Sequence, residues 1–372
     1  MPEVLSRRAL NRATLDRQLL LTRAELPALE AVRHLYGMQA QAPNPPYVGL
    51  WTRLSGFAAD DLARLIDERL VVRLSLMRST IHLVTADDCL ALRPLLGPTL
   101  ARGLRGTAHG RGLAGVDLDE LAAVGRKLVE ERPLTFRELG ALLRERWPEA
   151  PAADLVAGVR NTLALVQVPP RGIWGVGGQA AHTTAEAWLG RSQDERPGRV
   201  LAEEAIGRYL AAYGPATVMD AQQWSGMTRL GEVFREMDLR TFVTEDGAEL
   251  FDLPEASRPD PATPAPVRYL SEFDNTLLSF AQRTRTRITE EEYRGRIFTV
   301  NGIIKATVLV DGFVRGMWKV TGKRDEAVLE VELFAPVSEG ERAELEVEGA
   351  RVLDFVAPAA TSRDIRFRLP EA

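Results

Sequence analysis

Cysteine and lysine are both scarce in this sequence of 372 residues. The one cysteine, Cys89, has no second cysteine with which to form an internal disulfide. Only four lysines stand against 43 arginines, and such a bias arises either from phosphate and guanine recognition or from GC-rich coding. The polar start MPEVLSRRALNRATL lacks the apolar core of a signal peptide. We therefore expect a cytoplasmic protein.

Residues of common catalytic and metal sites are also few. The four histidines include no His-x-x-x-His pair, so a zinc site held by protein ligands is not expected. There is no Gly-x-Ser-x-Gly elbow. The glycines within RGIWGVGG lack the spacing of a dinucleotide-binding loop, and a wing hairpin explains them better. These absences disfavour the common hydrolases, dehydrogenases and kinases, and we expect no metal and no cofactor.

The overall composition is that of a soluble globular protein, with 45% hydrophobic and 27% charged residues. The length predicts two or three packed units of ~150 residues and no membrane span. The net charge of −5 is unevenly spread. Residues 1–113 hold 15 arginines and 10 acidic residues, a net of +5, so the remaining 259 residues carry −10. A polyanionic partner would meet the N-terminal part of the surface.

Three short helices followed by a hairpin are predicted in residues 116–190. Residues 119–164 show apolar side chains at helical spacing in three runs, and Thr135 with Glu138 forms a capping-box pattern. The two-stranded stretch LVQVPPRGIWGVGG follows. This order is the winged-helix arrangement.

The same pattern is found in two other parts of the chain. Residues 191–255 contain an amphipathic run at 199–213, a helix start at GPAT, a third helix around MTRLGEVFREM and an extended segment with an Asp246-Gly247 turn. Residues 1–115 show predicted helices near 6–20, 27–38 and 60–69 followed by the strand-like VVRLSLMRSTIHLV. We therefore predict three tandem winged helices.

A proline-rich connector, PEASRPDPATPAP, precedes a change of period. Residues 256–372 alternate apolar and polar side chains, with Asn301-Gly302 and Asp311-Gly312 at turn positions. We expect a β-barrel or strongly twisted sheet here, crossed by one helix near SEGERAELEVEGARVLDFV. The predicted fold class is α+β, with tandem winged helices arranged around a C-terminal β-barrel.

The segment LYGMQAQAPNPPYVGLW carries two glutamines two positions apart. Gln39 and Gln41 point to the same side only if the chain is extended, and Gly37 and the Asn44-Pro45-Pro46 run favour leaving a helix here. Two converging amides can hold a water or hydroxyl in a fixed orientation. The alternative is a polar helix exit whose glutamines bind backbone groups.

A second candidate segment is MRSTIHLVTADD. Arg78, Thr80 and His82 share one face if it is a strand. A lone strand histidine is more often a hydrogen-bonded structural residue than a functional one. Both interpretations stay open at this point.

A third candidate segment is YLSEFDNTLLSFAQRTRTR. Asp274 and Asn275 follow an apolar run. The alternation of Arg283, Arg285 and Arg287 puts three guanidinium groups on one side of an extended chain, either for phosphate binding or as a solvated face.

These motifs together resemble the AlkZ-like winged-helix family of bacterial DNA glycosylases, which unhook alkylated bases and interstrand crosslinks. The resemblance spans nearly the whole chain and rests on RRALNRATL, Gln39-Ala40-Gln41 with PNPPYVGLW, LMRSTIHLV, EFDNTLLS and VNGI…VDGFVRGMWKV. It is especially close to members that protect a producer of azinomycin from its own crosslinker. The family pattern is glutamine, an apolar residue and glutamine, or aspartate in another branch.

The resemblance implies that Gln39 and Gln41 are catalytic. A purine alkylated at N7 leaves readily as a neutral base, so the enzyme supplies a positioned water beneath C1′ and a polar environment for the oxocarbenium ion. Undamaged guanine and uracil should then be poor substrates. No lysine lies near the glutamines, which favours a monofunctional enzyme. Five residues are candidates for active-site support: Arg78, Thr80, His82, Asp274 and Asn275.

The implied partner is double-stranded DNA with alkylated purines or crosslinks, bound by a monomer that contacts no membrane and associates with the nucleoid when on DNA. The stretch TLARGLRGTAHGRGL has no acidic residue. We predict that it forms a basic hairpin or loop that holds the DNA backbone through Arg102, Arg105 and Arg111. Arg283, Arg285 and Arg287 form a second predicted DNA-binding set. A basic concave face on an otherwise acidic protein would make binding depend on salt.

Two other functions fit the same sequence. A non-enzymatic winged-helix transcriptional regulator would bind a preferred DNA sequence, usually as a dimer. A drug-sequestering resistance protein would line a pocket with Gln39, Gln41 and Trp51. Only the enzyme leaves abasic sites in alkylated DNA.

Overall fold

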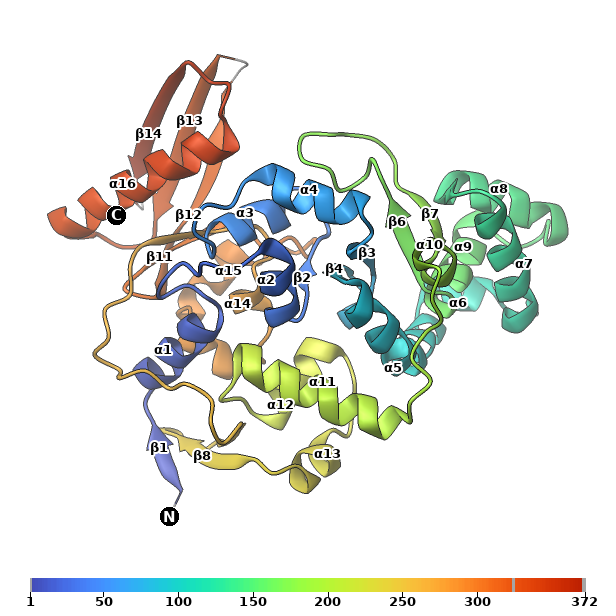
Figure 1. The fold of residues 1–372 in the computed structure, drawn as a ribbon, viewed down its shortest axis with the longest axis horizontal. Coiled ribbons are helices and arrows are strands. Elements are labelled where there is room, and N and C mark those ends of the chain that lie inside the picture. Colours follow the sequence, from blue (N-terminus) through green and yellow to red (C-terminus); the bar gives the residue numbers. More distant parts are fainter. Residues whose placement is uncertain (1, 323–324, 370–372) are drawn as a thin grey trace.

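The computed structural model describes residues 2–322 and 325–369. Its fold is mixed α and β, with three sheets and the helices that pack on them. Figure 1 shows α7, α8 and α9 at one side of the molecule and β13, β14 and α16 at another. No helix in the described ranges is both long and apolar enough to cross a membrane.

A six-stranded sheet, ordered β2-β4-β3-β6-β7-β5, joins two parts of the chain. Both parts run helix, strand, helix, helix, strand, strand. Segment one consists of α2 (Ala28–His34), β2 (Met38–Gln39), α3 (Pro45–Trp51), α4 (Ala59–Asp67), β3 (Val71–Ser75) and β4 (Ile81–Thr85). Segment two consists of α7 (Leu118–Glu131), β5 (Leu134–Thr135), α8 (Phe136–Arg146), α9 (Ala152–Thr162), β6 (Leu165–Val168) and β7 (Ala181–Thr184). They meet where β3 and β6 pair antiparallel.

A third part of the chain has nearly the same order of elements. Segment three consists of α11 (Gly198–Tyr213), α12 (Val218–Ser225), α13 (Gly231–Glu236), β8 (Arg240–Thr244) and β9 (Glu249–Asp252). An isolated antiparallel bridge between Ala216 and Phe251 occupies the place of the first strand. The N-terminal strand β1 (Glu3–Leu5) adds to β8 in parallel, and α1 (Arg7–Arg17) packs on α11.

Capping residues fix several helix starts. Thr135 accepts a hydrogen bond from the backbone of Glu138, whose carboxylate binds the Thr135 backbone in return, so the predicted capping box is present. Thr217 and Asp220 form the equivalent box at α12. A helix over Pro45–Trp51 was not expected, because the Asn44-Pro45-Pro46 run indicated only an exit from a helix. Proline is in fact well suited to the first helical positions.

Two helices replace the predicted basic hairpin or loop. The residues that connect segments one and two form α5 (Ala86–Arg105) and α6 (Ala108–Gly112), and α10 (Ala185–Leu189) follows segment two. The hydroxyl of Thr107 caps α6 by accepting from the backbone of Gly110. The prediction of a hairpin or loop was therefore wrong, because a capped helix starts within the glycine-rich stretch.

The C-terminal part holds a five-stranded sheet of order β10-β11-β12-β13-β14. Its strands and main helix are β10 (Arg268–Leu270), β11 (Thr307–Val310), β12 (Phe313–Thr321), β13 (Glu326–Leu333), α16 (Glu339–Val356) and β14 (Ser362–Arg368). Short helical turns lie between β10 and β11: α14 (Asn275–Leu278), η2 (Thr284–Arg287), η3 (Glu291–Tyr293) and α15 (Arg294–Ile297).

This C-terminal sheet is open, so of the two predicted forms, a β-barrel or a strongly twisted sheet, the described strands do not form the closed barrel. Helix α16 lies between β13 and β14 in the chain, and β14 returns parallel to β13. That crossover places β14 at one edge and β10 at the other, and the two do not pair. The predicted helix does cross the sheet, since Gly349 of α16 lies against Leu329 and Tyr269. Coverage by α16, rather than closure, buries this face of the sheet.

Ion pairs join the basic N-terminal part to the acidic remainder, some of them buried and some at the surface. Arg17 contacts Asp252 at 2.7 Å and Arg23 contacts Glu348 at 2.5 Å. Arg8 and Arg12 both pair with Asp311. Part of the positive charge counted in residues 1–113 is thus neutralised by ion pairs within the fold and is not available to a partner at the surface.

Candidate functional site

Gln39 lies at the edge of the six-stranded sheet, where β2 pairs with β4. The backbone is extended at Met38–Gln39, as predicted, and Gln39 stands opposite His82. A turn at Gly37 leads into the strand with φ of +97°, and a Cβ there would lie 2.8 Å from a methyl carbon of Val84. Glycine is therefore needed to aim the chain into β2.

The carbonyl of Gln39 is held by a half-buried guanidinium group, that of Arg78. Nη2 of Arg78 donates to Oε1 of Gln39 at 3.0 Å, and Nη1 of Arg78 donates to the backbone oxygen of Trp224 at 2.5 Å. Because guanidinium only donates, this contact fixes which end of the amide is oxygen. The Gln39 residue is 7% exposed. Its side-chain amide N–H groups have no hydrogen-bond partner in the described ranges.

Gln41 is exposed and lies just beyond the strand. Its Oε1 accepts from the backbone N–H of Ile81 at 3.2 Å, next to the hydrogen bond from the Ala40 N–H to the Ile81 oxygen at 2.7 Å. The carbonyl has a second lone pair for another donor. Gln39 therefore offers a donor and Gln41 an acceptor beside the same strand.

The backbone between the two glutamines is supported from the other face of the sheet. Nη2 of Arg73 donates to the carbonyl of Ala40 at 2.7 Å. Arg73 is 2% exposed, burial lowers its pKa to about 10, and its Nε and Nη1 have no hydrogen-bond partner among the described residues. A charged residue inside the apolar run VVRLS was the signal that sequence reasoning missed.

Arg78 and Thr80 do not lie on the strand that was predicted for them. They belong to the turn around η1 (Met77–Ser79), and Arg78 and Ser79 both have positive φ. The prediction that Arg78, Thr80 and His82 share one face of a strand is therefore wrong. Arg78 nevertheless reaches Gln39, while the hydroxyl of Thr80 donates to the Met77 oxygen.

His82 is a buried neutral partner of the site. Nδ1 of His82 lies 3.0 Å from the carbonyl oxygen of Thr80, so this nitrogen carries the proton. Burial lowers the pKa of His82 to about 3, assisted by the charge of Arg78. The imidazole stays uncharged near neutral pH and is poorly suited to proton transfer there.

Asp274 and Asn275 support segment one from the C-terminal part. Asp274 forms two contacts of 2.8 Å with Arg53 at the end of α3, and both side chains are almost fully buried. Although burial raises the pKa of Asp274, the charge and hydrogen bonds of Arg53 outweigh it and the pKa is lowered. The side chain of Asn275 donates to the Gly37 oxygen at 2.9 Å. This adjacent pair thus holds the turn before Gln39 in place.

The predicted alternation of Arg283, Arg285 and Arg287 on one exposed side is wrong. They lie in or beside the helical turn η2, not on an extended chain. Arg287 is 1% exposed and donates to the Pro215 oxygen, and Arg285 donates to the Phe280 oxygen. Only Arg283 is exposed, and it pairs with Asp246 at 2.7 Å. Arg287 cannot reach a DNA phosphate in this arrangement.

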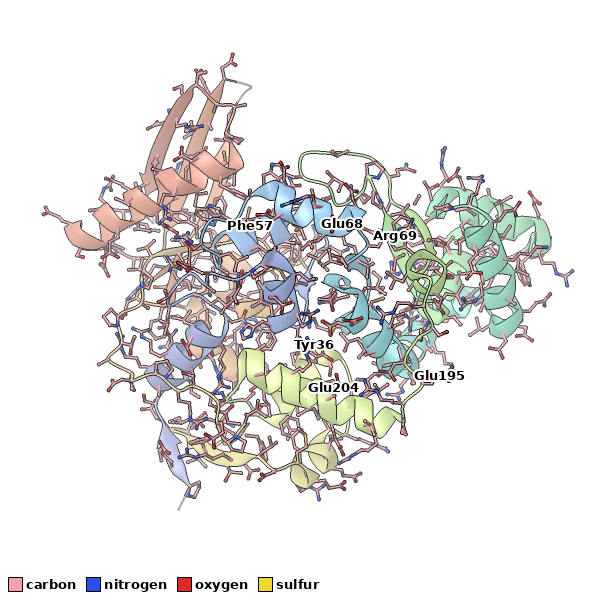
Figure 2. The ribbon with its side chains drawn as sticks, in the orientation of Figure 1. Tyr36, Phe57, Glu68, Arg69, Glu195 and Glu204 are labelled. Atoms are coloured by element: carbon pink, nitrogen blue, oxygen red, sulfur yellow. The ribbon has the colours of Figure 1, made fainter. Side chains whose placement is uncertain are left out.

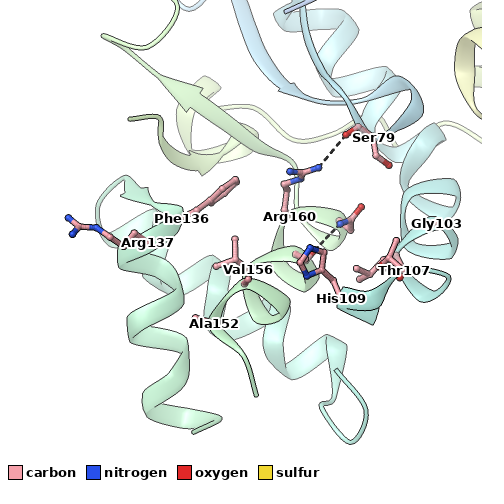
Figure 3. A pocket seen from close by; sticks show the side chains of 13 residues that line it. Ser79, Gly103, Thr107, His109, Phe136, Arg137, Ala152, Val156 and Arg160 are labelled. Carbon is pink, nitrogen blue, oxygen red and sulfur yellow. Dashed lines mark hydrogen bonds between the residues drawn. The ribbon is translucent and has the colours of Figure 1, made fainter. Parts of the chain in front are cut away.

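Arg102, Arg105 and Arg111 are all exposed, on α5 and α6. None of them forms an ion pair with a residue that the structure describes. Their helices border a pocket of about 630 Å³ that also contacts α8, α9 and η1. Figure 3 shows Arg160 reaching from α9 to Ser79, the residue after Arg78. The pocket therefore adjoins the turn that holds Gln39.

Metal ligands are not assembled near this site. Within residues 2–322 and 325–369, no group of three or more His, Cys, Asp or Glu side chains could hold a metal ion. The functional groups on hand are amides, guanidinium groups and a neutral imidazole.

Segment three completes the site from a distant part of the sequence. Trp224 stacks on Tyr36 with ring centroids 5.4 Å apart. The guanidinium carbon of Arg208 also lies over the Tyr36 ring, 4.0 Å from its centroid. The hydroxyl of Tyr213 donates to the Leu35 oxygen at 2.8 Å. Figure 2 shows Tyr36 beside α11. No short-range pattern could have identified Trp224 as the partner of Arg78.

Three comparisons relate the chain to known proteins. The family model described as DNA glycosylase AlkZ-like matches residues 32–355. An interstrand DNA cross-link repair glycosylase of Streptomyces sahachiroi is 25% identical over 324 residues, covering 82% of this chain and 85% of that protein. The solved structure of the Streptomyces sahachiroi DNA glycosylase AlkZ has a TM-score of 0.80 and 22% identity, covering 98% of this chain and 100% of that one.

The structural likeness establishes a shared mixed α and β fold. The family match covers most of the chain, including the glutamines, the η1 turn and the Asp274 support. The protein belongs to the AlkZ-like family of DNA glycosylases.

Proposed function

We propose that the protein is a monofunctional DNA glycosylase that hydrolyses the N-glycosidic bond of N7-alkylated purines. The observation that carries the proposal is the pair of neutral amides, with Gln39 fixed by Arg78 and Gln41 bound to β4. The name of the cross-link repair relative supports interstrand crosslinks as substrates. We further propose that the protein acts as a monomer and confers resistance to a DNA-alkylating natural product.

The two amides can orient one water molecule completely. The N–H of Gln39 donates to the water oxygen, and the free lone pair of the Gln41 carbonyl accepts one water proton. The remaining lone pair of the water then points to C1′. The bond between C1′ and the base nitrogen breaks with its electrons going to the base, and the water oxygen bonds to C1′. The surplus proton passes to solvent, because neither amide can take it.

An alkylated leaving group removes the need for an acid. Alkylation at N7 gives the purine a positive charge, and departure of the base neutralises it. His82 need not protonate the base, consistent with its low pKa of about 3. Neutral lesions such as uracil lack this activation and should be excised poorly.

We further propose that segments one, two and three are winged helices, because each has the element order of that motif. In this interpretation α9 occupies the position of a recognition helix. The basic side chains of α5 and α6 lie next to it, so DNA binding on this side places the duplex near η1 and Gln39.

Excision from a crosslinked duplex tests the proposal. The protein is incubated with DNA carrying one N7-guanine interstrand crosslink, and the strands are separated on a denaturing gel before and after alkali. We expect unhooked strands that break at an abasic site only after alkali. Uncut crosslinks would favour a regulator or a drug-sequestering protein, and breakage without alkali would show a lyase activity.

Replacing Arg78 by methionine is expected to lower the single-turnover rate of excision by roughly 10- to 100-fold, the worth of one hydrogen bond from a charged group. The Gln39 amide would lose the contact that fixes its oxygen. The equilibrium affinity for duplex DNA should change little. An unchanged rate in a variant with an unchanged melting temperature would contradict the positioning role, and Arg78→Lys should recover part of the loss.

Substituting glutamine at Arg102, Arg105 and Arg111 together is expected to weaken binding to every DNA sequence. The slope of log affinity against log salt should fall by about 3, since each phosphate contact contributes about one. The matched control replaces Arg144, Arg229 and Arg235, which are exposed arginines elsewhere. Equal effects of the two triple variants would show that only net charge matters.

A further inference from the structure

The pocket beside α9 has features that excision chemistry at the glutamines does not use. We call it the α9 pocket, with a volume of about 630 Å³ enclosed by side chains of α5, α6, α8, α9 and η1. That volume lies in the range of pockets that hold nucleotide-sized ligands. Ala152, Ala153, Val156 and Ala157 of α9 give it an apolar wall.

An aromatic ring is held in place at this wall. Phe136 lines the α9 pocket, and its ring stacks on His182 with centroids 3.9 Å apart and an angle of 5° between planes. His182 is 3% exposed, and burial lowers its pKa to about 4, so the backing ring is neutral near pH 7. A fixed, partly exposed phenyl ring is a platform on which a flat base can stack.

Two guanidinium groups border the same space. Arg137 and Arg160 line the α9 pocket and form no ion pair with a described residue. Arg160 is held by its contact with the Ser79 oxygen at 3.2 Å, and its buried Nε has no hydrogen-bond partner in the part of the chain that the structure describes. The nearby carboxylate of Asp154 already binds His109 at 2.5 Å. The pocket therefore presents positive charge that a phosphate would neutralise.

The α9 pocket is linked to the Gln39 site through two consecutive residues. Arg160 binds the carbonyl of Ser79, and the preceding Arg78 binds Gln39. Figure 3 shows Phe136 and Val156 on the far side of Arg160 from Ser79. A DNA strand that runs from the α9 pocket past Ser79 and Arg78 would therefore contact both the pocket and the glutamines.

We propose that the α9 pocket binds one unstacked nucleotide of the DNA, with its base against Phe136 and its phosphate near Arg137 and Arg160. The proposal rests on the DNA partner of the proposed function and adds a second contact site outside the scissile bond. A flat base suits the apolar wall and the ring, and the phosphate suits the two cations. If the pocket is used in this way, the protein should bind DNA in which one nucleotide is already unstacked more tightly than a continuous duplex.

Binding to undamaged DNA tests this without any excision. Fluorescence anisotropy compares a continuous duplex with the same duplex carrying a single-nucleotide bulge. We expect the wild-type protein to bind the bulged duplex roughly five- to tenfold more tightly, in the range found for base stacking on an aromatic side chain. Phe136→Leu should abolish this preference and leave affinity for the continuous duplex within about twofold.

Two further variants keep the test decisive. Ala153→Leu fills the pocket without removing an existing contact, so it should also abolish the preference for the bulged duplex. It takes the place of Phe136→Leu in the test if that variant is unstable. Arg144→Gln lies on the same helix as Phe136 but outside the pocket and should behave like wild type. A bulge preference that persists in both pocket variants, or no preference in the wild-type protein, would overturn the proposal. A loss of excision with an intact bulge preference would refute the proposed function alone.

Discussion

Replacing Gln41 or Gln39 with alanine is expected to lower the single-turnover rate of excision of N7-alkylguanine by roughly 100- to 1000-fold, as for loss of one positioned hydrogen-bonding group in other enzymes. In the proposed mechanism, each substitution removes one of the two contacts that orient the water. Affinity for DNA should change little, because neither amide carries charge. The rates are measured with enzyme in excess over a duplex with one alkylated guanine.

The matched control is Gln282→Ala, since Gln282 is an exposed glutamine whose amide binds Glu291 in the C-terminal part. Gln39→Glu gives a second comparison, in which the new side chain has nearly the same size as glutamine. Its carboxylate would pair with Arg78 and offer no N–H donor, so the protein should stay folded while the rate falls as in Gln39→Ala. Wild-type rates in both Gln39→Ala and Gln41→Ala would exclude a catalytic role for the pair.

Removing the Asp274 carboxylate should be the most destabilising single change near the site. Asp274→Ala leaves the buried Arg53 without its counter-ion, and loss of one partner of such a pair costs roughly 3–5 kcal/mol of unfolding free energy. The adjacent Asn275 should then hold Gly37 less firmly. We expect both stability and excision rate to fall, as measured by urea unfolding and single-turnover kinetics.

Comparing the loss of stability with the loss of excision rate distinguishes residues that support the site from residues proposed to take part in the reaction. Glu346→Ala, which breaks an exposed pair with Arg342, should change stability little. Gln41→Ala should lower the rate while leaving unfolding unchanged, because Gln41 is exposed. An Asp274→Ala protein as stable as the wild type would contradict the supporting role of this ion pair.

Local patterns predicted much of the order of elements. The helical spacing and the Thr135 cap identified segment two, and the Asp246-Gly247 turn lies between β8 and β9 as expected. Helix α5 was missed because Pro94 and Pro98 within it indicate a break. Its burial against α9 and α11 overrides that local preference.

Long-range pairing was beyond the sequence alone. The union of segments one and two through β3 and β6, and the crossover that leaves the C-terminal sheet open, depend on contacts between distant residues. The candidate site shows the same limit. Gln39 and Gln41 are two positions apart in the chain and were recognised from their spacing. Trp224 and Asp274, in contrast, lie more than 180 residues from the two glutamines in the sequence.

Charged residues were the least predictable part of the site. The alternation of Arg283, Arg285 and Arg287 looked exposed, yet Arg287 is buried over Phe280. Among the described residues, six of the 15 arginines in residues 1–113 pair with acidic residues from the rest of the chain. Arg102, Arg105 and Arg111 are exposed and form no ion pair with a residue that the structure describes, as expected of residues proposed to bind DNA.

The most direct test of the central claim is the identity of the released product. DNA methylated at N7 of guanine is incubated with the wild-type protein and with the Gln39→Ala/Gln41→Ala double variant, and the small-molecule fraction is analysed by mass spectrometry. We predict free 7-methylguanine, in equal amount to the abasic sites, from the wild-type protein only. Equal release by both proteins, or none by either, would contradict the account.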